Sequence, residues 1–213
     1  GVEIDSKFLK SLSSKFEKKI QKLEKEVFKI SKKEFNIASP KQLGEIIYND
    51  LKIAGLKKTK KGSFATSASV LEDLAFKGHE FPKLILDWRQ VSKLKNTYSD
   101  ALPEHLNPNT KRVHTSFLLA ATTTGRLASS DPNLQNIPIK SEDGKDIRKA
   151  FTAKKGHLLI SADYNQIEMR ILADLADVKE LKKAFKNKED IHSLTASQIF
   201  NIDIKKVNQD HRR

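Results

Sequence analysis

The chain has 213 residues, 38% of them hydrophobic, which is enough for one large domain or two smaller ones with a packed core. It contains no cysteine, which excludes a disulfide framework and a thiolate zinc site and favours a reducing compartment such as the cytoplasm. The net charge of +13 favours a polyanionic partner such as nucleic acid, although a surface that uses lysine by default gives the same excess.

The first hundred residues have the hydrophobic period of helices. Their first apolar stripe predicts one helix of about 30 residues and consists of Leu9, Leu12, Phe16, Ile20, Leu23, Val27 and Ile30. Two interpretations are open: the stripe packs on another helix of the same chain, or residues 5–34 form a coiled-coil seam between two copies. Ser39, Pro40 and Gln42 predict a capping box that opens a short second helix.

A basic connection follows and leads into a second long helix. Residues 57–69 contain four lysines, a glycine and few apolar side chains. Ser69 and Glu72 predict a second capping box. The helical period then returns over residues 82–102, at Leu84, Trp88, Val91, Leu94 and Tyr98. A long helix that returns after a basic tip predicts an antiparallel helical hairpin.

From residue 101 onwards the pattern is mixed. Residues 112–129 predict two strands around a glycine-containing turn, residues 129–146 predict a loop, and residues 157–164 predict a short strand. Helices are expected over 166–176, 178–187, 190–200 and 204–213, the third capped by Asp190. We therefore predict an α+β fold in two parts, a helical part over residues 1–100 and a part over residues 101–213 with a short antiparallel sheet and helices.

Asp163 is the first candidate for chemistry. It stands where the predicted strand 157–164 gives way to a helix, and ligand sites tend to form beyond strand ends. Magnesium takes one or two carboxylates plus phosphates, so one acid is half a site. The alternative is an N-cap for the following helix. Glu168 and Gln166 lie in the first turns of that helix, where a negative charge is favourable in itself. The predicted buried face of the helix consists of Met169, Leu172 and Ala176.

Residues 122–138 combine Arg126 with the amide side chains of Asn133, Gln135 and Asn136. Amides both donate and accept hydrogen bonds and arginine donates in a fork, which suits sugar, phosphate and minor-groove base edges. An Asn-rich loop that satisfies its own backbone explains the same residues. His192 and the Arg212–Arg213 pair predict no site by themselves.

Four segments, in this order and spacing, resemble family A DNA polymerases. They are TTTGRLASSDPNLQNIP (122–138), ISADYNQIEMRILADL (160–175), KEDIHSLTASQIF (188–200) and QDHRR (209–213). The resemblance extends to ASPKQLGEII (38–47) and VLEDLA (70–75) and so covers the whole chain. It implies that residues 1–100 are a thumb, whose helices grip the minor groove of duplex DNA, and that residues 101–213 are the first part of the palm, up to the start of the fingers.

The resemblance also implies roles for single residues. Asp163 would be the catalytic acid that binds two magnesium ions, with the carbonyl of Tyr164 as a further ligand. The incoming dNTP would be contacted by Gln166, Glu168, His192 and Arg212. The primer–template would be contacted by Arg126, Asn133, Gln135, Asn136, Lys57, Lys58, Lys60, Lys61 and Lys93.

The implied activity is nucleotidyl transfer from a dNTP to a primer 3′-hydroxyl in DNA replication and repair, by a monomer in the bacterial cytoplasm. Asn165 and Met169 depart mildly from the family pattern, which usually has Ser and Leu there. The second metal-binding carboxylate and the rest of the fingers helix lie beyond the matched segments, so we expect the 213-residue chain alone not to polymerise. The alternative is a non-catalytic module that binds duplex DNA. No apolar run approaches the roughly 20 residues of a membrane span, and the first ten residues lack a signal core.

Overall fold

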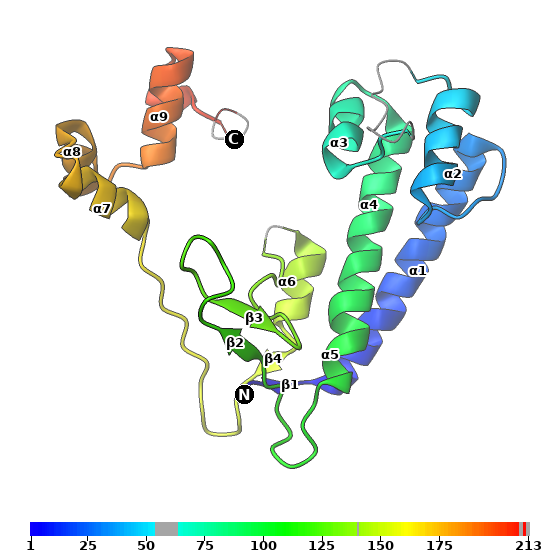
Figure 1. Ribbon diagram of the computed structural model, residues 1–213, viewed down its shortest axis with the longest axis horizontal. Coiled ribbons are helices and arrows are strands. Elements are labelled where there is room, and N and C mark those ends of the chain that lie inside the picture. Colours follow the sequence, from blue (N-terminus) through cyan, green and yellow to red (C-terminus); the bar gives the residue numbers. More distant parts are fainter. Residues whose placement is uncertain (54–63, 140, 209–210, 212–213) are drawn as a thin grey trace. The chain divides into compact units, whose positions relative to one another are not determined.

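The computed structural model describes residues 1–53, 64–139, 141–208 and 211 (Figure 1). The chain divides into two compact units, Gly1–Leu159 and Ile160–Arg213. Helices predominate, and the described residues also form two small antiparallel sheets. The predicted α+β class is confirmed.

The first long helix, α1 (Ser6–Ser31), forms as its stripe predicts. Its N-terminus is capped by Asp5, whose carboxylate accepts a hydrogen bond from the Phe8 amide at 2.9 Å. Ile30 is only half-buried. The other stripe residues are at most 9% exposed, namely Leu9, Leu12, Phe16, Ile20, Leu23 and Val27.

Helix α4 (Glu80–Leu94) runs antiparallel beside α1 (Figure 1). It continues through one π-helical segment, η2 (Lys95–Asp100), into the short α5 (Ala101–Glu104). The stripe of α1 and the apolar residues of α4 and η2 belong to one buried cluster. The predicted hairpin is therefore confirmed. The coiled-coil interpretation is wrong for this stripe, because the chain itself already covers it.

The predicted caps are only partly right. Ser39 caps α2 (Pro40–Glu45), since its hydroxyl accepts from the Gln42 amide at 3.4 Å. Gln42 does not close the box: its side-chain oxygen accepts from the Asn36 amide at 2.7 Å, because the Ser39 amide already donates to the Asn36 carbonyl. Helix α3 (Ala68–Phe76) begins before Ser69, so Ser67 is the N-cap position and the second predicted box is wrong.

Helix α2 passes directly into the π-helical η1 (Ile46–Asp50). Gly44, inside α2, allows a close approach, because a Cβ there would lie 2.7 Å from Cβ of Phe64. The Phe64 ring also stacks on Tyr48 at 3.7 Å between centroids. A glycine in this helix therefore permits packing that compensates for its poor helix propensity.

The two sheets are small. Strand β1 (Glu3–Ile4) pairs with β4 (Phe151–Thr152), which joins the N-terminus to the end of α6 (Glu142–Arg148). Strand β2 (Ser116–Leu118) pairs with β3 (Ala128–Ser130), and Gly125 between them has a positive φ of 73°. Two strands around a glycine-containing turn were predicted here and are confirmed.

Ion pairs join α6 to the side of α1. Lys15 contacts Asp146 at 2.8 Å and Lys19 contacts Asp143 at 2.5 Å. Beneath them Ile147 and Ala150 extend the buried cluster of the hairpin. The start of α1 is thus held by a strand pair, and its middle by apolar contacts and by charge.

The second unit consists of α7 (Ile167–Leu175), α8 (Lys179–Lys186), α9 (Ile191–Phe200) and the 3₁₀ turn η3 (Ile204–Lys206). Asp190 caps α9 as predicted, accepting from the His192 amide at 3.0 Å. The predicted buried face of α7 is wrong: Leu172 and Ala176 are exposed and Met169 is half-buried. Ala173 is buried instead, on a helix tied to α8 by the Arg170 guanidinium, which lies 4.4 Å from the centre of the Phe185 ring.

Two further predictions fail. Residues 157–164 form no strand, because β4 pairs only with β1 and no other strand of the described chain offers them a partner. The predicted helix over 204–213 is limited to the turn η3, while residues 209, 210, 212 and 213 lie outside the described residues. No helix in the described ranges is both long enough and apolar enough to cross a membrane.

Candidate nucleic-acid interface

The loop after β3, residues 131–138, is here named the amide loop. Its apolar side chains, Leu134 and Ile137, are half-buried and pack against the core of the hairpin. Its amide side chains are exposed, those of Asn133, Gln135 and Asn136. The loop therefore turns its amides to solvent because its leucine and isoleucine face inward.

Hydrogen bonds fix how two of these amides are oriented. The Ser129 amide donates to Oε1 of Gln135 at 3.1 Å, and the Gln135 amide donates to Oδ1 of Asn133 at 3.0 Å. A backbone N–H can only donate, so each side-chain oxygen must face inward and each NH₂ group outward. The interpretation that the loop satisfies its own backbone is thus correct for the two oxygens. Within the described chain, these NH₂ groups have no hydrogen-bond partner.

Side chains from two helical segments hold three consecutive carbonyls of the amide loop. The Tyr98 hydroxyl, from η2, donates to the Asn136 carbonyl. Arg148, at the end of α6, donates to the carbonyls of Ile137 and Pro138, both at 3.2 Å. The backbone of the loop is therefore fixed both to η2 and to the end of α6.

Arg126 lies exposed on the β2–β3 hairpin, just before β3. Its carbonyl accepts a hydrogen bond from the Thr122 hydroxyl at 2.7 Å, which closes the turn around Gly125. The predicted DNA contacts Arg126, Asn133, Gln135 and Asn136 thus belong to one hairpin and the loop that follows it.

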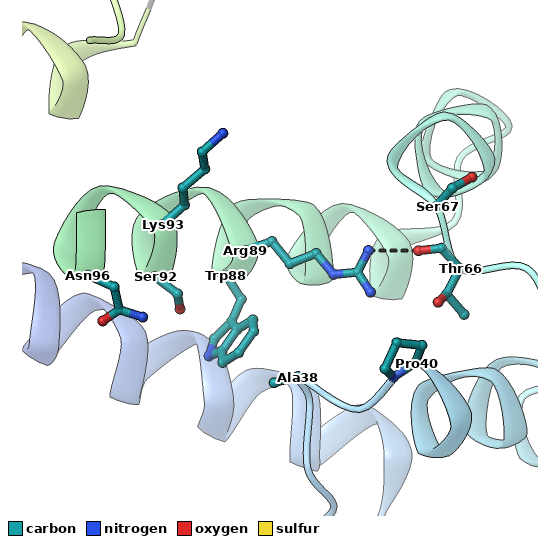
Figure 2. Close-up of a pocket in the computed structure, with 9 residues that line it drawn as sticks. All are labelled: Ala38, Pro40, Thr66, Ser67, Trp88, Arg89, Ser92, Lys93 and Asn96. Carbon is teal, nitrogen blue, oxygen red and sulfur yellow. Dashed lines mark hydrogen bonds between the residues drawn. The ribbon is translucent and has the colours of Figure 1, made fainter. Parts of the chain in front are cut away.

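Lys93 lines an open pocket of about 610 Å³ on the helical hairpin (Figure 2). Arg89, one helical turn earlier on α4, lines it too and donates to the Thr66 carbonyl at 2.7 Å. Sequence reasoning missed Arg89, although its i, i+4 spacing to Lys93 on a predicted helix was a usable signal. The lining residues are Ala38, Pro40, Thr66, Ser67, Trp88, Arg89, Ser92, Lys93 and Asn96.

Two cationic side chains line the pocket, and a buried hydroxyl lies in its wall. Burial lowers the pKa of Arg89, but an arginine still carries its charge at neutral pH. Trp88 directs its indole N–H to Glu24, at 3.1 Å. The Ser92 hydroxyl oxygen is buried and has no hydrogen-bond partner among the described residues. An anion near this pocket would be attracted by the positive charges of Arg89 and Lys93, although the Lys93 side chain points away from the other lining side chains (Figure 2).

Asp163 and Tyr164 lie exposed in a stretch without regular secondary structure before α7. The N-cap position of α7 belongs to Gln166, which has a left-handed conformation with φ of 53°. The alternative of Asp163 as the cap of this helix is therefore wrong. Glu168 is in the first turn of α7 and His192 in the first turn of α9, both exposed.

The described residues do not make a complete metal site. Nowhere in the described ranges do three His, Cys, Asp or Glu side chains come together in a way that could hold an ion. Asp163 alone offers one carboxylate, which is less than two magnesium ions require. Arg212, Lys57, Lys58, Lys60 and Lys61 lie outside the described residues.

Comparison with known proteins assigns the family. The family model described as DNA polymerase family A matches residues 6–213. The chain belongs to DNA polymerase family A. Two similar members are DNA polymerase I of Rhizobium leguminosarum, 51% identical over 213 residues, and DNA polymerase I of Caldicellulosiruptor bescii, 49% identical over 212 residues.

Both alignments cover all of this family A chain, but only 21% and 25% of the relatives' own length. A solved structure with the same fold is the POL domain of Pol1 from M. smegmatis in complex with DNA primer–template and dNTP. The TM-score is 0.87 at 38% identity, and the match covers all of this chain and 37% of that one. The chain thus spans about a quarter or less of these two curated relatives.

Proposed function

We propose that this chain is part of a template-directed DNA polymerase, which adds nucleotides from dNTPs to a primer 3′-hydroxyl, and that it binds the primer–template duplex. The observation that carries the proposal is the family match over residues 6–213. It is supported by the similar polymerase domain whose structure contains DNA primer–template and dNTP. In this proposal residues 1–100 are the thumb and residues 101–213 part of the palm.

The amide loop fits the minor groove of duplex DNA. Every base pair displays acceptor atoms there, and a G·C pair only adds a donor, so an outward NH₂ group can bind without reading the sequence. Asn133 and Gln135 present such donors, and Asn136 and Arg126 lie exposed on the same hairpin and loop. We propose that these four residues contact the primer–template near the primer terminus.

The pocket on the helical hairpin fits the phosphate backbone. Arg89 and Lys93 supply two positive charges one helical turn apart, which suits contacts to phosphate oxygens. Phosphate contacts of this kind position a duplex without specifying its sequence and weaken steeply with salt. We propose that Lys93 contacts the phosphate backbone here, and that Lys57, Lys58, Lys60 and Lys61 are further contacts to the duplex.

The second unit carries the proposed contacts to the dNTP and metal. We propose that Gln166, Glu168, His192 and Arg212 face the incoming nucleotide and that Asp163, with the Tyr164 carbonyl, is a ligand of magnesium. The family resemblance implies that two magnesium ions stabilise the negative charge that develops during phosphoryl transfer. Since the described residues offer only one such carboxylate, we expect the 213-residue chain alone to be inactive. We further propose that it acts in the cytoplasm as a monomer.

Two assays of the 213-residue chain test this function. A fluorescein-labelled primer–template should bind with a Kd that rises steeply between 50 and 200 mM salt, and primer extension with dNTPs and Mg²⁺ should give no product. Absent or salt-insensitive binding would contradict the DNA-binding role, and robust extension would contradict the expected inactivity. A non-catalytic DNA-binding module predicts equal affinity for blunt and recessed duplexes, whereas a polymerase part should prefer the recessed 3′ end.

A further inference from the structure

Tyr98 joins the helical hairpin to the amide loop. The residue is 2% exposed, and its ring lies in the core shared with α1 and α4. Its hydroxyl reaches out of that core and donates to the Asn136 carbonyl, 38 positions further along the chain. A phenylalanine would fill the same apolar space, so packing alone gives no reason for the hydroxyl.

The hydroxyl is a fixed donor. Burial raises the pKa of Tyr98 above that of a free tyrosine, so it keeps its proton at neutral pH. A buried tyrosine O–H requires a partner, and the Asn136 carbonyl is the acceptor that the fold provides. The bond therefore sets where the backbone of residue 136 lies relative to η2.

The segment η2 is itself anchored to α1. Asp100, its last residue, accepts from the Lys95 ammonium at 2.8 Å and from the Ser13 hydroxyl at 2.5 Å. Lys95 also pairs with Glu17 on α1 at 3.5 Å. Isolated π-helical turns are frequent at functional sites, and this one puts the tyrosine between the hairpin and the loop. A displacement of the hairpin would therefore be transmitted to the amide loop.

We propose that Tyr98 is a positioning residue for DNA binding: its hydroxyl holds the amide loop in register with the helical hairpin, so that the outward amides and the cationic pocket engage one duplex together. This inference rests on the proposed function. Arg148 is the second anchor, because it holds the two carbonyls that follow residue 136. Neither anchor needs to touch DNA.

The test compares Tyr98→Phe with Ser99→Ala in the 213-residue chain. Both changes remove one buried hydroxyl from η2, but the Ser99 hydroxyl bonds only within η2. We expect Tyr98→Phe to weaken binding of a labelled primer–template about three- to tenfold and Ser99→Ala less than twofold. Urea unfolding verifies that each variant is folded. Equal affinities for Tyr98→Phe and the parent chain would overturn the proposal.

A double-mutant cycle separates positioning from a general structural effect. If Tyr98 acts through the amide loop, its effect on affinity should largely disappear in a Gln135→Ala background, while its effect on the urea midpoint should remain. Hydrogen exchange of the peptide over residues 131–138 should also be faster in Tyr98→Phe and unchanged in Ser99→Ala. An affinity loss that is fully additive with Gln135→Ala, or unchanged exchange, would overturn the proposal.

Arg148→Lys keeps the inference testable if Tyr98→Phe proves too unstable to measure. This variant keeps the charge on an exposed residue but loses the fork that holds two carbonyls. It should weaken DNA binding, again non-additively with Gln135→Ala. Parent-like binding would mean that the position of the loop does not matter, which overturns the role of Tyr98 as well. By contrast, no DNA binding by the parent chain, or no effect of Gln135→Ala, would refute the proposed function itself.

Discussion

Replacing Gln135 by Glu tests the orientation of the amide loop without altering its shape. One carboxylate oxygen can still accept the hydrogen bond from the Ser129 amide, which Oε1 of Gln135 accepts at 3.1 Å. The other replaces the outward NH₂ donor by a negative charge. Since the residue is exposed and keeps its inward bond, we expect the free energy of unfolding to change by less than about 0.5 kcal/mol.

Binding to DNA should respond much more strongly. Loss of one donor contact costs about 1 kcal/mol, and a new charge about 4 Å from a phosphate adds about 1 kcal/mol of repulsion in water. The sum of about 2 kcal/mol corresponds to about 30-fold in Kd. Fluorescence anisotropy with a labelled primer–template at 50 mM salt measures this change, and urea unfolding monitors stability.

Gln198→Glu is the matched control. It makes the same charge change at an exposed position of α9, in the second unit and outside the amide loop. We expect its Kd to stay within about twofold of the parent chain, as for an ordinary surface substitution. A Gln135→Glu chain that binds as well as the parent, or no worse than the Gln198→Glu chain, would refute the assigned orientation.

Three further changes test other parts of the structure. Phe16→Ala removes a fully buried ring from the seam of the hairpin and should lower the free energy of unfolding by about 3–5 kcal/mol in urea titrations; a loss below 1 kcal/mol would contradict the packing. The pKa of Asp146 is lowered from 3.8 by hydrogen bonds from Lys149 and Lys15. The stabilisation by its carboxylate should be complete above about pH 5 and lost as the pH falls through that lowered pKa. In urea titrations Asp146→Asn should therefore have a lower free energy of unfolding than the parent chain at pH 7, and the two values should converge near pH 2. Trp88 is the only tryptophan and lines the cationic pocket, so bound duplex DNA should change its fluorescence emission. Lys93→Ala should shift that titration to higher DNA concentrations. Emission that stays constant up to saturating DNA would contradict DNA binding in this pocket.

The sequence predicted best what local periodicity controls. The stripe from Leu9 to Val27 identified α1, and the glycine-centred pattern around Gly125 identified the β2–β3 hairpin. Predictions failed where the local structure depends on a distant strand or on a competing hydrogen-bond partner. Gln42 left its expected box because Asn36 competes for the same groups, and residues 157–164 stay without regular structure because no strand lies beside them.

In the candidate site, too, local patterns were predictable and contacts between distant residues were not. Chemistry and resemblance selected Asn133, Gln135 and Asn136, but only the structure reveals which atom of the Asn133 and Gln135 amides faces outward. Arg89 was within reach of sequence reasoning through its helical spacing to Lys93. The bond from Tyr98 to Asn136 was not, because 38 residues separate its ends and nothing local relates them.

The length of α1 has a mechanical consequence. Its 26 residues make an unbroken rod of about 39 Å, held at its middle by the ion pairs of Lys15 and Lys19 to α6, so that about 18 Å of helix follows Lys19. Such a rod acts as a lever about Lys19, so a tilt of about 5° there carries the far end through about 1.6 Å, about half the rise of one base pair. In the DNA-binding role proposed above, a tilt that leaves both ion pairs intact therefore displaces the tip by about half a base-pair step.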